Sequence, residues 1–170
     1  ILPDIHSAIN GTSVTVELWF RANAAGVIVN ELGSPGVGSG WHDTWIEVLA
    51  TGEVKVRVWN LGSVSLGTVS FGTWHHVALR HNATTNRLDG LLDGVPSSSS
   101  SSGSRSTSGA VFLAFGIADA QNLGSGAYLN GTIDEVRIWH RALCDGEIVN
   151  NMSGRLSGPQ TGLVAYYTLD

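Results

Sequence analysis

Short runs in which apolar and polar residues alternate recur along the whole chain, and they constrain its fold more than any other feature. A period of two places apolar side chains on one face of a strand, whereas a helix needs a period near 3.6. Turn sequences rich in glycine separate the runs, and 22 of the 170 residues are glycine. The runs are 14-VTVELWF-20, 26-GVIVNEL-32, 44-TWIEVLA-50, 53-EVKVRVW-59, 74-WHHVALR-80, 87-RLDGLLDG-94, 111-VFLAFGI-117, 132-TIDEVRIW-139 and 163-LVAYYTL-169. We therefore predict an all-β protein whose antiparallel strands pack as two sheets.

Two segments depart from this pattern. The segment 145-DGEIVNNM-152 predicts one short helix, with Cys144 at its N-cap and Glu147 three residues later, as in a capping box. The segment 97-SSSSSSGSRSTSG-109 has no apolar side chains to bury, so we expect a flexible loop. The flanking strands are too few to form separate cores, and residues 1–170 are predicted to be a single domain.

Charge and cysteine content narrow the possible partners. The formal net charge is −5 and the nine basic residues are scattered, which argues against a nucleic-acid partner. No apolar run reaches the roughly 20 residues of a membrane span, so we expect no membrane insertion. The single cysteine, Cys144, excludes an internal disulfide and a cysteine-rich zinc site.

The third and fourth runs form a hairpin whose register can be predicted. Val54, Val56 and Val58 make the apolar face of the second strand, and the apolar residues of the first strand also hold even positions. Even positions must face even positions, since a slip of one residue would turn one strand inside out. This pairing requires a loop of odd length. The loop 50–52 meets that need, with Gly52 in the left-handed conformation of a three-residue turn.

This register leaves the odd-numbered side chains on the other face, which we expect to be exposed. The predicted surface comprises Trp41, Asp43, Trp45, Glu47, Arg57 and Trp59, with Glu31 and His42 near its rim. Indoles stack on the apolar faces of sugars while carboxylates and guanidinium groups bind hydroxyls, so one interpretation is a glycan-binding platform. An ordinary solvent face with a cation–π pair and a contact surface for another protein are the alternatives.

Several segments are similar to one protein family. The segment 131-GTIDEVRIWHRALCDGEI-148 resembles the closing signature of LamG-like jelly-roll domains, relatives of laminin G modules and pentraxins. The segment 72-GTWHHVALRHNATTNRLDGLLDGV-95 is similar to the central strands of that family, and 162-GLVAYYTLD-170 to its last strand. With 14-VTVELWF-20, the resemblance spans nearly the whole chain. It implies a two-sheet antiparallel jelly-roll sandwich of the concanavalin A-like type.

The superfamily that this resemblance implies also contains glucanases, so the spacing of carboxylates tests for catalysis. Glycoside hydrolysis needs two carboxyl groups about 5–5.5 Å apart for retention or about 6.5–9.5 Å for inversion. Asp43 and Glu47 share a face but lie roughly 13 Å apart, and the adjacent Asp134 and Glu135 point to opposite faces. A pair assembled across strands, such as Glu31 with Asp43, stays open. We expect that the protein is not an enzyme.

Asp134 is the candidate metal ligand. It shares parity with Val136 and Ile138, so its side chain should start on the apolar face, where a carboxylate needs hydrogen bonds or a cation. Calcium favours a carboxylate combined with backbone carbonyl groups. A structural Ca²⁺ and hydrogen bonds to backbone amides are therefore both open. His75 and His76 are adjacent on a strand and cannot chelate one ion together.

These interpretations favour a non-catalytic, carbohydrate-binding (lectin-like) module of a larger protein that is secreted and acts outside the cell or at its surface. Its expected partner is a glycan or polysaccharide. The alternative is an adhesion or spacer module that contacts other extracellular proteins and has no sugar site. A glycoside hydrolase is disfavoured by the carboxylate spacing.

Overall fold

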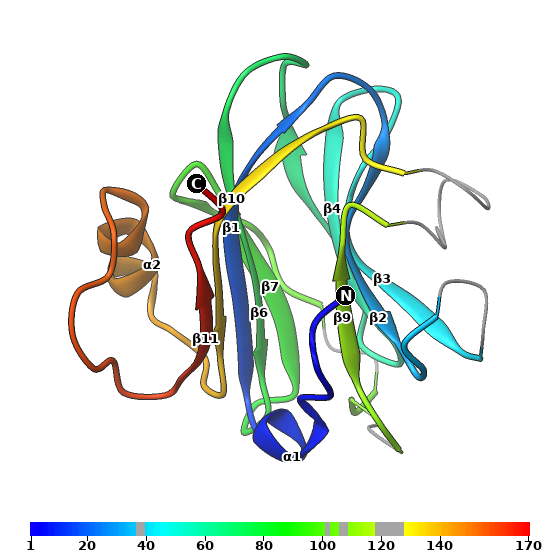
Figure 1. Ribbon diagram of the computed structural model, residues 1–170, viewed down its shortest axis with the longest axis vertical. Helices are drawn as coiled ribbons and strands as arrows, with labels where there is room; N and C mark the ends of the chain where they lie inside the picture. The colour runs from blue at the N-terminus through cyan, green and yellow to red at the C-terminus, as the bar shows by residue number, and fades with distance from the viewer. Residues whose placement is uncertain (37–39, 101–102, 106–108, 118–127) are drawn as a thin grey trace.

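The computed structural model describes residues 1–36, 40–100, 103–105, 109–117 and 128–170, and these residues form two antiparallel sheets that pack face to face (Figure 1). Sheet A has the order β11-β10-β1-β6-β7-β8, with β1 (Val14–Ala22), β6 (His75–Asn82), β7 (Arg87–Leu92), β8 (Val95–Pro96), β10 (Gly131–Trp139) and β11 (Leu163–Tyr167). Sheet B has the order β5-β4-β3-β2-β9, with β2 (Gly26–Leu32), β3 (His42–Val48), β4 (Glu53–Val58), β5 (Gly62–Thr68) and β9 (Phe112–Phe115). The predicted two-sheet jelly-roll sandwich is confirmed.

The predicted helix is present with the predicted bounds. It is α2 (Asp145–Met152), and the Glu147 carboxylate accepts a hydrogen bond of 2.8 Å from the backbone N–H of Cys144. A second helix, α1 (His6–Ile9), has four residues, so the expectation of only one helix is wrong. A single turn is too short to show a helical period in a sequence. Neither helix in the described part of the chain is long and apolar enough to cross a membrane.

The hairpin of β3 and β4 has the predicted register. Glu47 lies opposite Lys55, and the apolar residues on both sides of this pair also face each other, as Ile46 with Val56. Gly52 has a φ of +81°, and a Cβ there would lie 2.5 Å from the carbonyl oxygen of Val69. Apolar alternation and one glycine were therefore sufficient to predict this hairpin.

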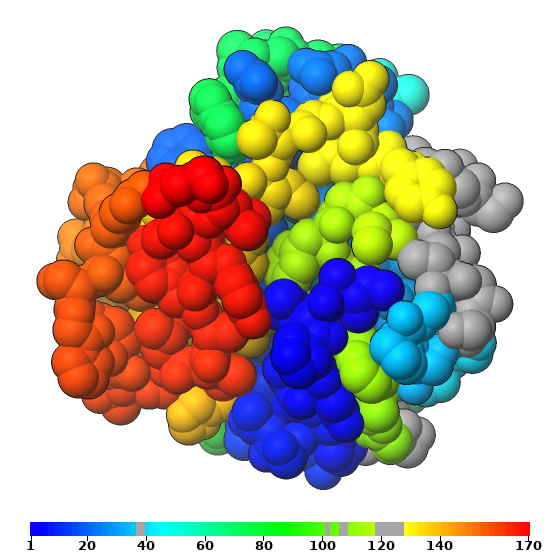
Figure 2. Space-filling model, in the orientation of Figure 1, coloured from blue at the N-terminus to red at the C-terminus, as the bar shows by residue number. Residues whose placement is uncertain are grey.

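Apolar side chains of both sheets form one core between them. Leu18 and Phe20 of β1 and Leu79 of β6 meet Ile46 of β3 there, and all four are fully buried. A smaller cluster lies on the outer face of sheet A beneath α2; it contains Ala78, Leu91, Trp139, Leu143 and Ile148. In Figure 2 the N-terminal segment, in dark blue, lies at one edge between the C-terminal segment and β9.

The serine-rich segment is part of the folded structure where it is described. Ser100 pairs with Leu88 of β7 through two backbone hydrogen bonds of 2.8 Å, and the N–H of Ser97 donates to Gly90 at 2.9 Å. The side chain of Arg105 is buried, with 4% of its surface exposed. The expectation that this segment buries nothing is wrong at Arg105, because a long side chain can pack its methylene groups in a core. Residues 101–102 and 106–108 of the predicted flexible loop lie outside the described residues.

Candidate functional site

The predicted ligand-binding side chains divide into a buried group and an exposed group. Glu31, Asp43, Trp45 and Glu47 are at most 3% exposed. In contrast, Trp41 is 44% and Trp59 is 57% exposed, while His42 and Arg57 are half-buried. The prediction of one exposed surface is therefore wrong. Val29 pairs with Ile46 but Asn30 pairs with Thr44, so Trp45 is the extra residue of a β-bulge that shifts the alternation of β3 by one residue. Trp45 therefore lies with Ile46 in the core between the sheets, and six of the seven residues of β3 are buried.

Trp45 belongs to the core and is held there by polar groups. Its indole N–H donates to the Glu31 carboxylate at 2.8 Å. The Arg105 guanidinium lies 5.4 Å from the Trp45 ring and 3.9 Å from the other oxygen of Glu31. Arg105 also donates to the carbonyl of Ile9 at 3.1 Å. We call Glu31, Trp45 and Arg105 the buried cluster; the serine-rich segment thus covers a tryptophan that the sequence placed on the surface.

Glu31 and Asp43 lie directly opposite each other on β2 and β3, so the cross-strand carboxylate pair left open by the sequence does form. Burial raises the pKa of Glu31 to about 7, although Arg105 and the Trp45 N–H act to lower it. Burial also raises the pKa of Asp43 to about 6, against the opposing effect of Arg57. Raised carboxyl pKa values are common in active sites, yet both carboxylates here are buried and engaged with protein donors. The arrangement offers a saccharide no access to the pair.

The exposed group lies where β3 begins and β4 ends. The Asp43 carboxylate accepts a hydrogen bond of 2.5 Å from the backbone N–H of Trp59 and lies 3.3 Å from Nε of Arg57. The Arg57 guanidinium is 6.0 Å from the centre of the Trp59 ring. The Trp41 indole covers Gly33 so closely that a Cβ at that glycine would be 2.2 Å from the indole nitrogen. We call Trp41, Arg57 and Trp59 the tryptophan surface.

The structure also exposes three aromatic residues that were not identified in the sequence as parts of a surface: Phe71, Trp74 and Tyr128. Phe71 and Trp74, 38% and 41% exposed, lie in the connection from β5 to β6, and the Arg21 guanidinium is 5.6 Å from the Trp74 ring. Since β5 runs antiparallel to β4, this connection lies at the end of sheet B opposite to Trp59. Trp74 was identified in the sequence only as the first residue of the run 74-WHHVALR-80, and Phe71 lies in a turn that gave no periodic signal.

A hydroxyl, an imidazole and a carboxylate follow one another beside this connection. The Thr73 hydroxyl is 2.7 Å from Nε2 of His75, and Nδ1 of His75 is 2.7 Å from the Asp93 carboxylate. Serine hydrolases use the same order of groups. Here the Thr73 hydroxyl also donates to the Ser70 carbonyl at 2.7 Å, and Asp93 accepts the backbone N–H of His76 at 2.8 Å. These bonds tie two turns together, so a structural role accounts for them.

Asp134 does not lie where parity predicted. Glu17 pairs with Arg137, but Trp19 pairs with Asp134, so Glu135 is the extra residue of a β-bulge and has a φ of +52°. The bulge shifts the alternation by one residue and puts Asp134 on the outer face with Trp19. The prediction that Asp134 starts on the apolar face is therefore wrong.

The Asp134 carboxylate accepts the backbone N–H of Glu135 at 2.8 Å, which is the hydrogen-bonding alternative from the sequence. Among the residues described, no group of three His, Cys, Asp or Glu side chains could hold a metal ion. Described side chains alone thus do not make a calcium site around Asp134. Calcium binding with the help of backbone carbonyl groups stays a prediction.

Comparison with solved structures shows the same fold in proteins of low sequence identity. A Bacteroides ovatus protein described as a candidate carbohydrate binder is 20% identical with a TM-score of 0.66; the match covers 94% of this chain and 46% of that one. The CBM40 of the Ruminococcus gnavus IT-sialidase, bound to α2,6-sialyllactose, is 12% identical with a TM-score of 0.61, covering 88% and 90%. A SAP-like pentraxin of Limulus polyphemus is 16% identical with a TM-score of 0.59, covering 87% and 70%.

Sequence comparison identifies the family. This chain spans less than half of the Bacteroides ovatus protein, and no curated protein matches its sequence. A family model described as the concanavalin A-like lectin/glucanases superfamily matches residues 1–149, which is most of the chain. The match agrees with the resemblance to LamG-like jelly-roll domains and with the two-sheet sandwich. The chain therefore belongs to the concanavalin A-like lectin/glucanase superfamily.

Proposed function

We propose that this chain is a non-catalytic carbohydrate-binding module and that the tryptophan surface is its sugar site. The observation that carries the proposal is the Trp59 ring, which is 57% exposed on a backbone whose N–H donates to the Asp43 carboxylate. Exposure of an apolar indole to water is unfavourable, and a ligand that covers the ring removes this cost. Because Asp43 already fixes the backbone at Trp59, binding there costs less conformational entropy than it would on a free loop.

The groups beside Trp59 suit a saccharide. The apolar face of a pyranose ring would stack on the indoles of Trp59 and Trp41. Arg57 would donate hydrogen bonds to ring hydroxyls or the ring oxygen, while its contact with Asp43, 3.3 Å away, orients the guanidinium. His42, half-buried at the start of β3, lies at the rim. The sequence also placed Glu31, Trp45 and Glu47 in this site. These side chains are buried, so we propose that they support the strands beneath the site and do not contact the sugar.

Two further observations support a binding function over catalysis. The Bacteroides ovatus candidate carbohydrate binder and the sialyllactose-bound CBM40 have the same fold as this chain. This similarity of fold supports a saccharide as the ligand. The Glu31–Asp43 pair is buried and bonded to protein groups. We place the module in a larger secreted protein, outside the cell or at its surface, where polysaccharides and glycans are available.

The proposal is tested by a glycan array with and without calcium, followed by calorimetry on any saccharide that binds. Trp59→Ala should weaken binding by roughly 1–3 kcal/mol, as expected for a truncated aromatic anchor. Trp74→Ala is the matched control, since Trp74 is also exposed but lies at the opposite end of sheet B. Equal losses in both variants would count against the tryptophan surface.

The calcium arm tests Asp134 separately. If calcium binds the folded state, a chelator should lower the melting temperature, and Asp134→Asn should remove that effect. If no saccharide binds at millimolar concentration while both tryptophans stay exposed, the adhesion or spacer module replaces this proposal.

A further inference from the structure

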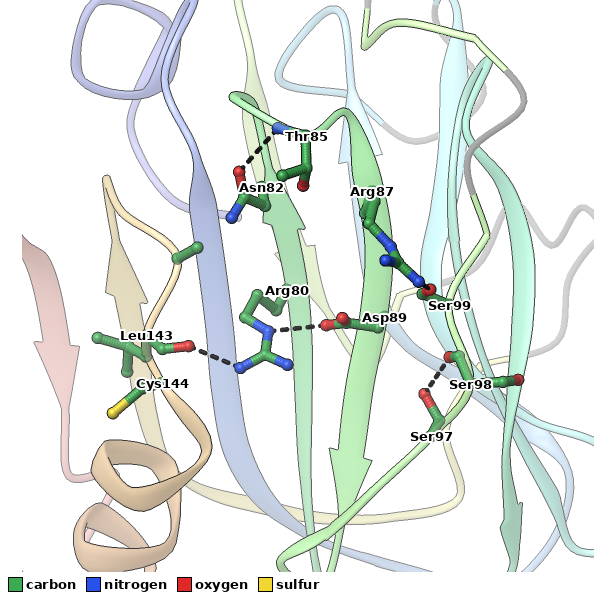
Figure 3. Close-up of a pocket in the computed structure, with 11 residues that line it drawn as sticks. Arg80, Asn82, Thr85, Arg87, Asp89, Ser97, Ser98, Ser99, Leu143 and Cys144 are labelled. Atoms are coloured by element: carbon green, nitrogen blue, oxygen red, sulfur yellow. Dashed lines mark hydrogen bonds and ion pairs between the residues drawn. The ribbon is translucent and has the colours of Figure 1, made fainter.

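A polar groove lies on the outer face of sheet A, which is the face that points away from sheet B. It runs between β6 and β7, the serines that follow β8, and the residues that precede α2 (Figure 3). Its volume is about 760 Å³, within the usual range for small-molecule sites. None of the residues that line it was predicted from the sequence to bind a ligand.

An ion pair forms the floor of the groove. Nε of Arg80 donates to the Asp89 carboxylate at 2.7 Å, and Nη1 donates to the Leu143 carbonyl and the Asp145 carboxylate, each at 2.7 Å. Figure 3 shows Arg80 and Asp89 facing each other from β6 and β7. Two carboxylates thus hold the Arg80 guanidinium in place. Together the three groups carry a net charge of −1, so the floor has no net positive charge of its own.

Arg87, at the side of the groove, has a different environment. Its guanidinium donates to the Ser99 hydroxyl, and no carboxylate of the described residues lies within 4.0 Å of it. Every other basic side chain except Arg21, which packs on Trp74, has such a carboxylate. In a chain with a net charge of −5, Arg87 therefore offers an uncompensated cation inside a groove.

We propose that this groove is a second binding site and that it takes an acidic saccharide. The carboxylate or sulfate of the ligand would pair with Arg87, since a guanidinium matches such groups with two parallel hydrogen bonds. Ser97, Ser98 and Asp89 would bind the hydroxyls of the sugar. The described lining contains no aromatic ring on which a nucleobase could stack. This inference extends the proposed saccharide-binding function to a second site and rests on it for the ligand class.

Cys144 provides a direct reporter of occupancy. It is the only cysteine of the chain, its thiol is free and exposed, and it lines the groove. A ligand in the groove should slow alkylation of this thiol by a maleimide. The rate would be measured with a uronic acid trisaccharide, a sulfated trisaccharide and a neutral trisaccharide of the same linkage. The two acidic ligands distinguish a carboxylate from a sulfate as the group that Arg87 binds.

We expect at least one acidic trisaccharide to protect Cys144 while the neutral one does not, and protection should fall as salt is added. Arg87→Gln should raise the concentration needed for half-protection roughly 10- to 100-fold, as expected for loss of a charge-assisted hydrogen bond. Arg21→Gln is the matched control, because Arg21 also has no carboxylate within 4.0 Å among the described residues but lies away from the groove. It should leave protection unchanged.

The outcomes separate this inference from the proposed function. Trp59→Ala should weaken binding at the tryptophan surface and leave the protection of Cys144 intact. Equal protection by the neutral trisaccharide, full protection in Arg87→Gln, or no protection by either acidic trisaccharide at millimolar concentration would each overturn the acidic-saccharide site. None of these three results would bear on the tryptophan surface.

Discussion

Trp45 and Trp59 lie on neighbouring strands of one hairpin, at positions of the same parity, and their surroundings are opposite. Trp45 is fully buried, covered by Arg105 from the serine-rich segment and bonded to Glu31. Trp59 follows the last residue of β4 and is 57% exposed, with Arg57 as its cationic neighbour. The same residue type therefore stabilises the core at one position and is available for a ligand at the other. A β-bulge that turns Trp45 into the core, and the packing of the distant Arg105 on its ring, make the difference.

The largest effect should separate the two tryptophans by stability. Trp45→Ala should lower the free energy of unfolding by about 3–5 kcal/mol, because it leaves a cavity and an unpaired Glu31 oxygen in the core. Trp59→Ala should lower it by less than about 1 kcal/mol. Urea unfolding of both variants measures this. Similar losses at both positions would contradict the division into a buried cluster and an exposed surface.

The next effect concerns how Arg105 and Glu31 cooperate in the buried cluster. Arg105→Met keeps the aliphatic part of the side chain, and Glu31→Gln keeps an oxygen to accept the Trp45 N–H. A double-mutant cycle on the unfolding free energy should give a coupling of about 0.5–3 kcal/mol. The exposed pair of Arg155 with Asp170 is the control and should give less than about 1 kcal/mol. A coupling near zero at Arg105 and Glu31 would mean that the arginine only fills space.

A smaller effect should depend on pH. Since burial raises the pKa of Glu31 to about 7, the folded protein retains a proton that the unfolded chain releases near pH 4.3. The stability that this proton contributes is complete below the unfolded pKa and is lost as pH rises through 7. Between pH 6 and pH 8 the unmodified protein should lose about 1 kcal/mol more than Glu31→Gln, measured by urea unfolding at both pH values.

Glu147→Gln is the control for this pH dependence. Burial alone would raise the pKa of Glu147, but the N–H of Cys144 and the Arg141 guanidinium lower it below its usual value. The carboxylate is therefore ionised in both the folded and unfolded states above pH 6. The variant should keep the pH slope of the unmodified protein. A Glu31→Gln slope equal to that of Glu147→Gln would show that Glu31 is ionised at neutral pH in the fold.

The smallest effect should be on fluorescence and should leave stability almost unchanged. Trp59→Phe should change the unfolding free energy by less than about 0.5 kcal/mol, since the side chain has few core contacts to lose. It should nevertheless remove part of the emission that acrylamide quenches, whereas Trp45→Phe should remove emission that acrylamide cannot reach. Quenching of Trp45 in the native state would place that ring at the surface after all.

Local patterns in the sequence were sufficient for the elements whose determinants lie close together in the chain. The alternation of Val54, Val56 and Val58 with polar residues, and the left-handed requirement met by Gly52, predicted the register of the β3–β4 hairpin. The spacing of Cys144 and Glu147 predicted where α2 begins. These features depend on residues that are close together in the chain, so the sequence alone was sufficient to predict them.

The candidate sites depended on contacts that join distant parts of the chain. A β-bulge turns Trp45 into the core, where Arg105, 60 positions later, packs on its ring. The groove near Arg87 is lined by the serines after β8, which pair with β7. One bulge residue, Glu135, moved Asp134 to the other face of its strand. By itself the sequence determined most of the strands, though not β5 or β8, and one helix, because periodicity is local. Only the tertiary structure decided which face met solvent, because coverage depends on side chains that sequence position does not bring together.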